Sequence, residues 1–349
     1  MKTIKNLYNN LINKEKIKSI IVLAAKGKKK RKSVQHVLNN IDEYTDKIYD
    51  MLQKGEFWLR KSHNKSIIEK GKKRMLTISP FYPNRILDYI IVETLKPCIR
   101  KGMYQYCVGN VDNKGMMYGK NYIAKNYKKY KYYIKLDIHK FYPSTSSTKM
   151  LDYIKRKVKD ERFLKLCELM ILSEPNLPIG SYYSQWFSNW YLQDLDHFIK
   201  QELRVPVYIR YVDDMVLFGN NKRKLLKAMY MIDEFLKTKG LRLKKYEQVY
   251  SIEQRPLDFL GFRFGETIKL RVRNFRHLNA SIKHVRQSKH ITVRQARSIM
   301  SLLGWLKQIK IGYVYYKNHI QNVVKKGTLR KIISEYDKKQ LQKIHGACA

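Results

Sequence analysis

The segment YIRYVDDMVLFG, residues 208–219, places two adjacent aspartates between two runs of mainly β-branched, aromatic and other apolar residues. Such runs favour β-strands, whereas aspartate is disfavoured in strands and common in turns. The segment therefore predicts an antiparallel hairpin with Asp213 and Asp214 in its turn. Their mutual repulsion would be relieved by a divalent cation, because carboxylates are natural ligands for Mg²⁺. A plain turn without a metal is the alternative.

A third carboxylate ends a second candidate strand. Asp137 follows the strand-forming run KYYIKL, and an unpaired buried carboxylate is costly. Either a basic residue or a metal would therefore pair with it. If this strand lies beside the hairpin, Asp137 and Asp213 face each other at one metal site. Two ions about 4 Å apart would activate an attacking hydroxyl and stabilise a leaving pyrophosphate, which is the chemistry of nucleotidyl transfer.

The charge balance points to a polyanionic partner. The chain has 72 Lys and Arg against 29 Asp and Glu, a formal net charge of +43, which is typical of nucleic-acid binding. We expect no membrane partner, because the sequence has no long uncharged span and no lipidation motif. The four cysteines lack metal-ligand spacing, and no signal peptide is evident, so we expect free thiols in the cytoplasm.

The remaining pattern mixes helices and short strands, which predicts an α+β body followed by a basic helical tail. A hairpin is expected at 66–79, and short strands are expected at 241–245 and 257–264. The basic tail begins at Asn274 and includes a helix with Thr292 as its N-cap. Further helices are expected at about 1–25, at 33–54 with Ser33 as N-cap, after Pro83, at 147–172, at 175–199 and at 222–239.

Five motifs resemble those of reverse transcriptases. YVDD (211–214) resembles the Tyr-x-Asp-Asp signature, and LDIHKFYPS (136–144) is similar to the motif that carries the other catalytic aspartate. KKRMLTIS with PNRILDYII resembles the fingers motifs, while GLRL (240–243) and DFLGF (258–262) resemble the late palm motifs. The motifs occur in the order that the family has. A single Tyr-x-Asp-Asp motif would be much weaker evidence for the family.

The resemblance implies roles for named residues. The implied catalytic residues are Asp137, Asp213 and Asp214, and the implied ligands of two Mg²⁺ ions, with Mn²⁺ as an alternative, are Asp137, Ile138, Asp213 and Asp214. Asp214 either binds metal or only tunes the site electrostatically. The implied dNTP-binding residues are Lys73, Arg74, Arg85, Tyr142, Ile179, Gly180 and Gln185. Tyr142 either excludes a 2′-hydroxyl or is core packing. Lys244 and Lys245 are both candidates for the general acid that protonates pyrophosphate.

The segment IGSYYSQ (179–185) bears on the subfamily. Group II intron reverse transcriptases carry Gln-Gly-x-x-x-Ser-Pro here, whereas Ile179 and Gln185 resemble the pattern of diversity-generating retroelements. That resemblance implies a bacterial or phage-encoded enzyme that copies template RNA into cDNA and misincorporates opposite adenines. It also implies a small, basic, oligomeric accessory protein as partner. A group II intron-like or defence-associated reverse transcriptase is the nearest rival, and a non-catalytic RNA-binding factor on the same fold is another.

The resemblance also implies a right-hand polymerase. We expect fingers over 1–125 with an N-terminal basic helical extension, a palm with an antiparallel sheet over 126–265, and a helical thumb over 266–349. Residues 146–177 are a candidate insertion within the palm. The expected partners are template RNA, the cDNA–RNA hybrid and dNTPs.

Overall fold

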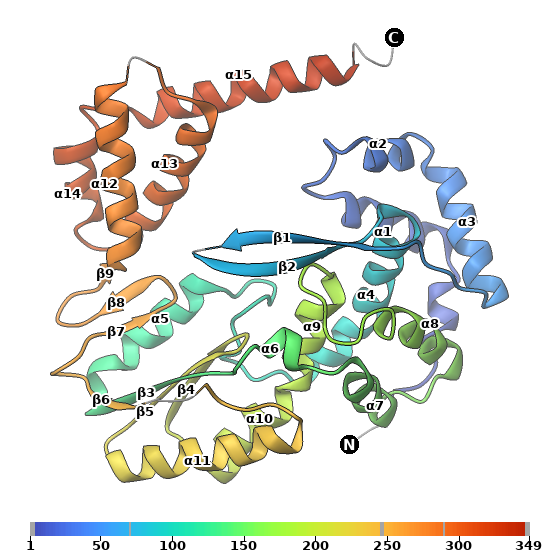
Figure 1. Ribbon diagram of the computed structural model, residues 1–349, viewed down its shortest axis with the longest axis horizontal. Helices are drawn as coiled ribbons and strands as arrows, with labels where there is room; N and C mark the ends of the chain where they lie inside the picture. The colour runs from blue at the N-terminus through green and yellow to red at the C-terminus, as the bar shows by residue number, and fades with distance from the viewer. Residues whose placement is uncertain (1–3, 70, 245–247, 289, 346–349) are drawn as a thin grey trace. The chain divides into compact units, whose positions relative to one another are not determined.

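The computed structural model describes residues 4–69, 71–244, 248–288 and 290–345, and the chain forms two compact units. The first unit comprises Met1–Gly119 and Tyr132–Val249, and the second comprises Lys120–Lys131 and Tyr250–Ala349. Helices are combined with antiparallel sheets, which agrees with the predicted α+β class (Figure 1). The limits proposed for fingers, palm and thumb divide the chain differently and stay predictions.

Three antiparallel strands form the centre of the first unit, in the order β4-β5-β3. They are β3 (Tyr132–Asp137), β4 (Val207–Tyr211) and β5 (Asp214–Gly219). Most of their residues are buried, because aromatic and branched side chains pack well on a pleated surface. These strands confirm the predicted hairpin and the predicted strand that ends at Asp137. A fourth strand, β6 (Val249–Ser251), begins where the first unit ends.

Helices make up most of the rest of the first unit. In chain order they are η1 (Asn9–Leu11), α1 (Lys14–Ala25), α2 (Lys32–Asn39), α3 (Ile41–Lys54), η2 (Phe81–Arg85), α4 (Ile86–Lys101), α6 (Phe141–Ser144), α7 (Ser147–Lys157), α8 (Glu161–Ile171), α9 (Tyr182–Tyr191), α10 (Gln193–His197), η4 (Phe198–Glu202) and α11 (Lys222–Thr238). Helix α5 (Met116–Asn126) runs from the first unit into the second. Helix α11 lies against β3 and β5.

Four helices predicted as continuous are interrupted. In the segment 1–25, η1 and α1 are separated by Ile12 and Asn13, and in the segment 175–199, α9 and α10 are separated at Leu192. The segment 33–54 breaks at Asn40, between α2 and α3, and α2 begins after Arg31, so Ser33 is not its N-cap. The segment 147–172 breaks between α7 and α8, where Asp160 accepts a hydrogen bond from the Phe163 amide as the N-cap of α8. Asp160 also accepts from the Tyr8 amide at 2.9 Å. This break before α8 is therefore joined to a distant N-terminal segment, which a local pattern does not reveal.

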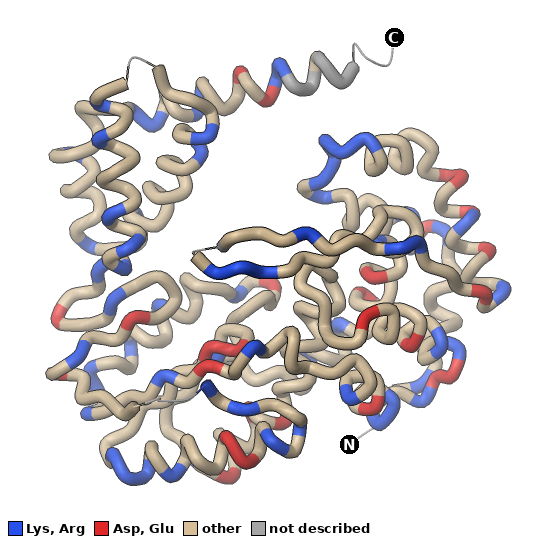
Figure 2. The backbone as a smooth tube through the Cα atoms, in the orientation of Figure 1, with Lys and Arg blue, Asp and Glu red and all other residues tan. Residues whose placement is uncertain are grey.

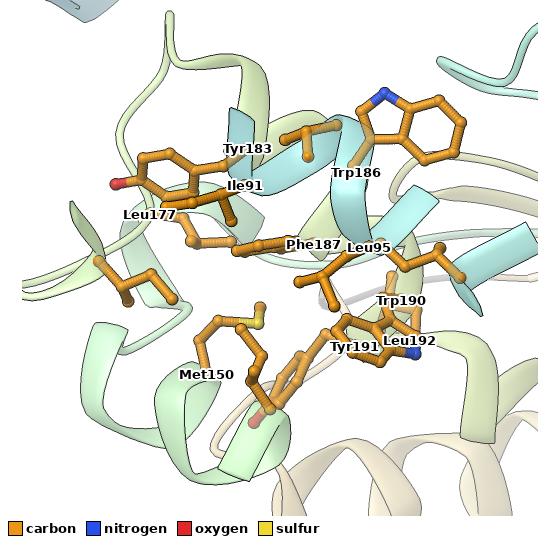
Figure 3. Packing of buried hydrophobic residues seen from close by; sticks show 14 of the residues in the cluster. Ile91, Leu95, Met150, Leu177, Tyr183, Trp186, Phe187, Trp190, Tyr191 and Leu192 are labelled. Carbon is orange, nitrogen blue, oxygen red and sulfur yellow. The ribbon is translucent and has the colours of Figure 1, made fainter. Parts of the chain in front are cut away.

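One part of the core of the first unit lies between α4, α7 and α9. Figure 3 shows Ile91 and Leu95 of α4 packed near the aromatic rings of Phe187 and Trp190 of α9, with Met150 of α7 below them. Each of these five residues is no more than 1% exposed. Burying one large apolar side chain contributes about 1.5–3 kcal/mol. The buried aromatic residues of α9 therefore anchor this helix, which begins within the IGSYYSQ segment.

The predicted hairpin at 66–79 is confirmed as β1 (His63–Glu69) paired with β2 (Lys72–Ile78). Gly71, near its turn, has a φ of +80°, a conformation that glycine adopts without steric cost. The outer part of the hairpin is exposed, and Ile68 retains 81% of its accessible surface. Its base is tied to the rest of the first unit, because the Thr77 amide donates to the Ile179 carbonyl at 2.9 Å.

The second unit combines a small sheet with a helical bundle. Its strands β7 (Leu257–Phe259), β8 (Phe262–Phe264) and β9 (Lys269–Leu270) form an antiparallel sheet. Its helices are η3 (Tyr127–Lys129), α12 (Val272–Gln287), α13 (Val293–Leu306), α14 (Gly312–Tyr315), η5 (Tyr316–Ile320) and α15 (Lys326–His345). Thr292 caps α13 as predicted, in a capping box with Gln295. The expected strand at 241–245 is not formed over 241–244, where Leu243 makes only an isolated bridge to Ile138.

Basic residues occur on most elements of both units, whereas acidic residues are fewer (Figure 2). The strand β2 carries the consecutive basic residues Lys72, Lys73 and Arg74, all of them exposed. Among the helices that the structure describes, none combines the length and hydropathy needed to cross a membrane.

Candidate active site

The two adjacent aspartates occupy different positions at the end of the β4–β5 hairpin. Val212 and Asp213 form the turn, whereas Asp214 is already the first residue of β5 and pairs with Tyr211. The predicted turn is therefore present, but only one aspartate of the pair lies in it. Asp214 tolerates the strand because it stands at the strand's end.

Asp137 lies directly opposite Asp214. Strand β3 runs antiparallel to β5 in a register that pairs its last residue, Asp137, with the first residue of β5. Directly opposed residues in such a pair have Cβ atoms only about 4.5–5.5 Å apart, and like charges there are destabilising. Burial, followed by the negative charges of Asp214 and Asp137, raises the pKa of Asp213 to about 6. All three carboxylates thus act on one another at one end of the sheet.

Two lysines flank these carboxylates. Lys135 Nζ lies 3.6 Å from Asp214 Oδ1, and Lys244 Nζ lies 3.6 Å from Asp137 Oδ2. The Lys244 amide also donates to the Asp137 carbonyl at 2.8 Å, which fixes this segment beside β3. Such partly exposed ion pairs contribute at most about 1 kcal/mol each, so neither pair by itself holds its ammonium group firmly beside the carboxylate. Lys245, the other general-acid candidate, lies outside the described residues.

Tyr142 lies close enough to the three aspartates for the charge of Asp213 to affect its pKa. It belongs to α6, and its hydroxyl forms a hydrogen bond with Ser188 of α9. Burial raises the pKa of this hydroxyl, the negative charge of Asp213 adds to the rise, and the positive charge of Arg74 opposes it. Arg74 also lowers the pKa of Asp213. The structure therefore brings Tyr142, Asp213 and Arg74 together although they are distant in sequence.

The two basic residues predicted on β2 point in different directions. Side chains alternate between the faces of a strand, so the neighbours Lys73 and Arg74 lie on opposite faces of the hairpin. Arg74 is the one whose charge acts on Asp213 and Tyr142.

Arg85 is bound within the protein rather than presented as a free cation. Its side chain is 13% exposed, and Nη1 donates to Asp88 Oδ2 at 3.0 Å and to the Gly180 carbonyl at 2.9 Å. Asp88 also accepts from the amides of Tyr182 and Tyr183, at the start of α9. Burial raises the pKa of Asp88, and the Arg85 charge opposes that rise. Arg85 thus orders the segment that precedes α9.

The IGSYYSQ segment docks on β2 through its backbone. Gly180 has a φ of +123°, and a Cβ atom there would lie 2.7 Å from the Thr77 carbonyl oxygen. Ile179 is half-buried, whereas Gln185 is exposed on α9. The structure therefore joins Ile179, Gly180 and Arg85 to the base of β2 but shows no side-chain partner for Gln185 among the described residues.

A family model described as reverse transcriptase (RNA-dependent DNA polymerase) matches residues 59–264. This match covers more than half of the 349 residues and includes all five motifs quoted above. The chain belongs to the reverse transcriptase family. It is therefore an RNA-directed DNA polymerase, a nucleotidyltransferase whose substrates are an RNA template and dNTPs. A comparison with curated proteins finds no match.

The carboxylates of this reverse transcriptase fit the divalent ions, usually Mg²⁺, that the family generally uses. The available donors are hard oxygen atoms, and a cation would offset both the burial and the neighbouring negative charges that raise the pKa of Asp213. Ile138 could add only its backbone carbonyl, since its side chain is a hydrocarbon. Within the described residues, no three acidic, histidine or cysteine side chains converge into a ready metal cage. Lys135 and Lys244 stand beside the carboxylates in this arrangement.

Several residues of this reverse transcriptase's site escaped the sequence analysis. Lys135 lies inside the strand motif, and Ser188 lies inside a helix that reads as core. Arg210, in β4, is the clearest omission, because it is fully buried directly before the YVDD segment. The sequence contains a signal for this residue, because one charged residue interrupts the otherwise apolar and aromatic run YIRYV. A charge in a buried strand needs a partner, and that partner is found elsewhere in the chain.

Proposed function

We propose that this reverse transcriptase copies a template RNA into cDNA by two-metal nucleotidyl transfer at Asp137, Asp213 and Asp214. The observation that carries the proposal is the pairing of Asp137 with Asp214 at the strand ends, with Asp213 in the adjoining turn. Carboxylates that repel one another in this way are suited to hold divalent cations. Asp213 is partly buried, and burial is the main cause of its raised pKa.

The proposed ions are two Mg²⁺, with Mn²⁺ as an alternative, held by the three aspartates and the Ile138 carbonyl. When bound, they would activate the attacking hydroxyl and stabilise the leaving pyrophosphate. Lys244 is proposed as the general acid, because its ammonium group lies 3.6 Å from Asp137 and its exposed side chain can reach outward. Lys245 remains a candidate by its position in the sequence alone.

For the dNTP site we propose different roles for the basic residues. Arg74 is suited to contact the triphosphate, because its charge already acts on Asp213. Lys73 lies on the opposite face of β2, so it is proposed to act only as part of the general positive field. Arg85 is proposed to shape the site through the Gly180 carbonyl rather than by direct contact. Tyr142 is proposed to exclude a 2′-hydroxyl, supported by its closeness to Asp213.

More specifically, we propose that the chain is a reverse transcriptase of the diversity-generating type, which makes errors at template adenines. This proposal is supported by Ile179 and Gln185, which replace the Gln and Pro of group II intron enzymes. Ile179 precedes a glycine whose backbone is held against β2, so a change of side chain there acts on an ordered segment. The resemblance also motivates a small, basic, oligomeric accessory protein as partner.

Primer extension on a defined RNA template, followed by sequencing of the cDNA, tests these proposals together. We expect Mg²⁺-dependent cDNA with substitutions concentrated opposite adenines. Accurate cDNA would favour a group II intron-like or defence-associated enzyme. No synthesis under any metal, with or without an added accessory protein, would favour a non-catalytic RNA-binding factor.

We also propose the right-hand arrangement of fingers (1–125), palm (126–265) and thumb (266–349) for this chain. The antiparallel strands that carry Asp137, Asp213 and Asp214 support the palm assignment. The basic helices α12 and α13 support a thumb that contacts nucleic acid. Residues 146–177 form α7, α8 and their connections and remain the candidate insertion.

A further inference from the structure

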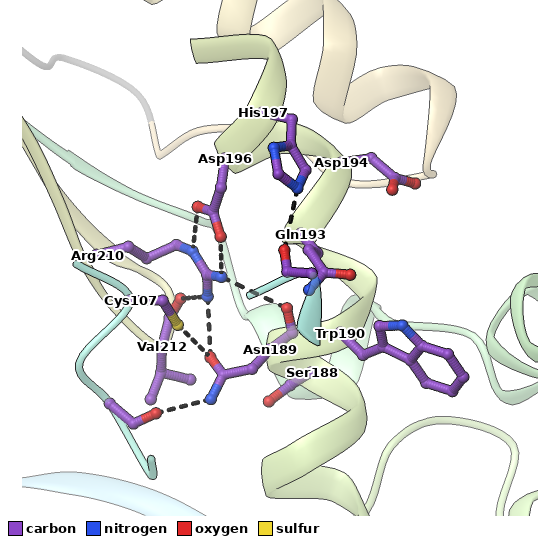
Figure 4. A network of polar contacts seen from close by, with 12 residues as sticks. Cys107, Ser188, Asn189, Trp190, Gln193, Asp194, Asp196, His197, Arg210 and Val212 are labelled. Atoms are coloured by element: carbon purple, nitrogen blue, oxygen red, sulfur yellow. Dashed lines mark hydrogen bonds and ion pairs between the residues drawn. The ribbon is translucent and has the colours of Figure 1, made fainter. Parts of the chain in front are cut away.

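Arg210 is a fully buried arginine in strand β4, and all five N–H groups of its guanidinium have acceptors. Nε and Nη2 donate to the two carboxylate oxygens of Asp196, which is equally buried. Nη1 donates to Asn189 Oδ1 and to the Val212 carbonyl, each at 2.9 Å (Figure 4). The second Nη2 hydrogen points to the Asn189 carbonyl at 3.4 Å. One side chain thus joins strand β4, helix α9 and helix α10.

A buried ion pair contributes little net stability to a fold. Removing two charges from water is costly, and an apolar pair of similar volume is often as stabilising or more so. Three of the five hydrogen bonds of Arg210, however, go to Asn189 and Val212 rather than to Asp196. An apolar pair could make none of these three. The reason for a guanidinium at this position therefore lies in what it holds besides Asp196.

What it holds is the turn of the catalytic hairpin. Val212 has a φ of +60°, which is an outlier for a β-branched residue and persists only where its surroundings hold it. Its carbonyl oxygen, bound by Arg210 Nη1, belongs to the peptide group that links Val212 to Asp213. The orientation of that peptide plane sets the direction in which the Asp213 side chain leaves the backbone.

A second contact holds Val212 from the other side. A Cβ atom on Gly109 would lie 2.7 Å from both the Val212 amide nitrogen and its Cγ2 atom, so the backbone of 109 is pressed against the turn. Asn189 Nδ2 donates to the Gly109 carbonyl at 2.7 Å, while its Oδ1 accepts from Arg210. Asn189 therefore connects the two contacts that enclose Val212 (Figure 4).

We propose that Arg210, oriented by Asp196 and linked through Asn189 to Gly109, is a positioning residue that holds the Val212–Asp213 turn in its strained conformation and so aims Asp213 at the metal site. Arg210 itself touches no substrate in this account. The inference rests on the proposed role of Asp213. It adds that the metal site depends on a buried network beneath the hairpin.

The variant Arg210→Lys tests the inference. Lysine keeps the positive charge for Asp196 but lacks the planar fork that reaches Asn189 and Val212 at the same time. Loss of a partner that orients a metal ligand typically weakens metal binding by about 10–100-fold. We expect the Mg²⁺ concentration for half-maximal primer extension to rise by about tenfold or more, while RNA binding and the KM for dNTP change little. Direct Mn²⁺ titration by electron paramagnetic resonance should show the same weakening without turnover.

Two further variants separate positioning from stability. Lys157→Gln removes another buried cation, which pairs with Asp194 on α10 at 3.4 Å, and it should leave the Mg²⁺ requirement unchanged even where the melting temperature falls. Val212→Gly removes the steric cost of a positive φ. Added to Arg210→Lys, it should recover about threefold or more of the lost Mg²⁺ affinity, because the strained turn then needs less support. A merely structural defect would not be rescued in this way.

The reactivity of the Cys107 thiol gives a test of the network around Arg210 that does not depend on polymerase activity. Its thiol donates to Asn189 Oδ1 at 3.4 Å, and burial raises its pKa to about 11, so the native protein should react slowly with iodoacetamide at pH 8. Arg210→Lys should speed the alkylation of Cys107 but not that of Cys167, which is buried on α8. Equal protection of Cys107 in both proteins, with an unchanged Mn²⁺ affinity, would overturn the inference.

The role proposed for Asp213 is tested separately from the positioning role of Arg210. If Asp213→Asn keeps its polymerase activity, the proposed role of Asp213 is wrong, whatever Arg210→Lys does. If Asp213→Asn is inactive and Arg210→Lys behaves like Lys157→Gln, only the positioning role of Arg210 is rejected.

Discussion

Gly180 and Thr77 are in such close contact that a Cβ atom on residue 180 would lie 2.7 Å from the Thr77 carbonyl oxygen. The contact is supported on both sides, because the Thr77 amide binds the Ile179 carbonyl and Arg85 binds the Gly180 carbonyl. It joins the base of the basic hairpin to the start of α9, the helix that carries Ser188 and Asn189. This one glycine therefore joins the motifs for which we propose nucleotide binding to the helix that carries Ser188 and Asn189.

Gly180→Ala should impair polymerisation and lower stability. The new Cβ would meet the Thr77 oxygen, and the φ of +123° would add about 1–3 kcal/mol of backbone strain. We expect a raised KM for dNTP and a lower melting temperature, measured by steady-state primer extension and thermal unfolding. Gly115→Ala is the matched control, because Gly115 has the same φ but no atom within 4 Å of its added Cβ. If both variants have the same KM, the Gly180–Thr77 contact does not shape the nucleotide site.

Asp213→Asn should abolish DNA synthesis while RNA binding survives, because the amide keeps the size but loses the charge that a cation needs. It should also stabilise the metal-free protein. Burial and two neighbouring carboxylates raise the pKa of Asp213 to about 6, so its ionised form disfavours the folded state at neutral pH. Removing that charge should gain on the order of 1–3 kcal/mol in EDTA, measured by denaturant unfolding. More than a few per cent of parental activity in Mg²⁺ would contradict the two-metal proposal.

Tyr142→Ala should allow the enzyme to incorporate ribonucleotides, because the ring would no longer occupy the space of a 2′-hydroxyl. Single-nucleotide extension with paired rNTP and dNTP substrates measures the discrimination directly. Tyr142→Phe is the control: it loses the hydrogen bond to Ser188 but keeps the ring, and it should discriminate as the parent does. Unchanged discrimination in Tyr142→Ala would assign Tyr142 to core packing.

Ile179→Gln should lower errors opposite template adenines more than errors elsewhere. Glutamine adds a hydrogen-bonding group that isoleucine lacks. One such bond is worth about 0.5–1.5 kcal/mol, which is at most about tenfold in discrimination. Sequencing of cDNA from the parent and the variant on the same RNA template gives the error spectrum. A uniform shift of all errors, or none, would leave Ile179 as a packing residue at the start of α9.

Local patterns were enough for the features that depend on neighbours in the chain. Both hairpins, the strand that ends at Asp137 and the Thr292 cap of α13 follow from strand propensity, turn residues and capping chemistry. The order of five motifs also predicted the family that the comparison later showed. The hairpins, the strand and the helix cap share one cause, because each is decided by side chains within a few positions of one another.

Other features depended on contacts that no local pattern contains. The break before α8 is joined to Tyr8, and Arg85 donates to the carbonyl of Gly180, 95 positions away. Asp214 lies in a strand rather than in the turn because β3 supplies a partner for it. Each of these contacts joins residues that are far apart in the sequence.

The sequence by itself therefore determined which chemical groups this reverse transcriptase has and that one strand end and one hairpin carry its aspartates. Only the tertiary structure decided how they are aimed. The register of β3 against β5 opposes Asp137 to Asp214, and Arg210 fixes the peptide plane before Asp213 through partners at 189 and 196. The physical reason is that a buried guanidinium and a strained turn are stable only when distant groups supply every hydrogen bond they need.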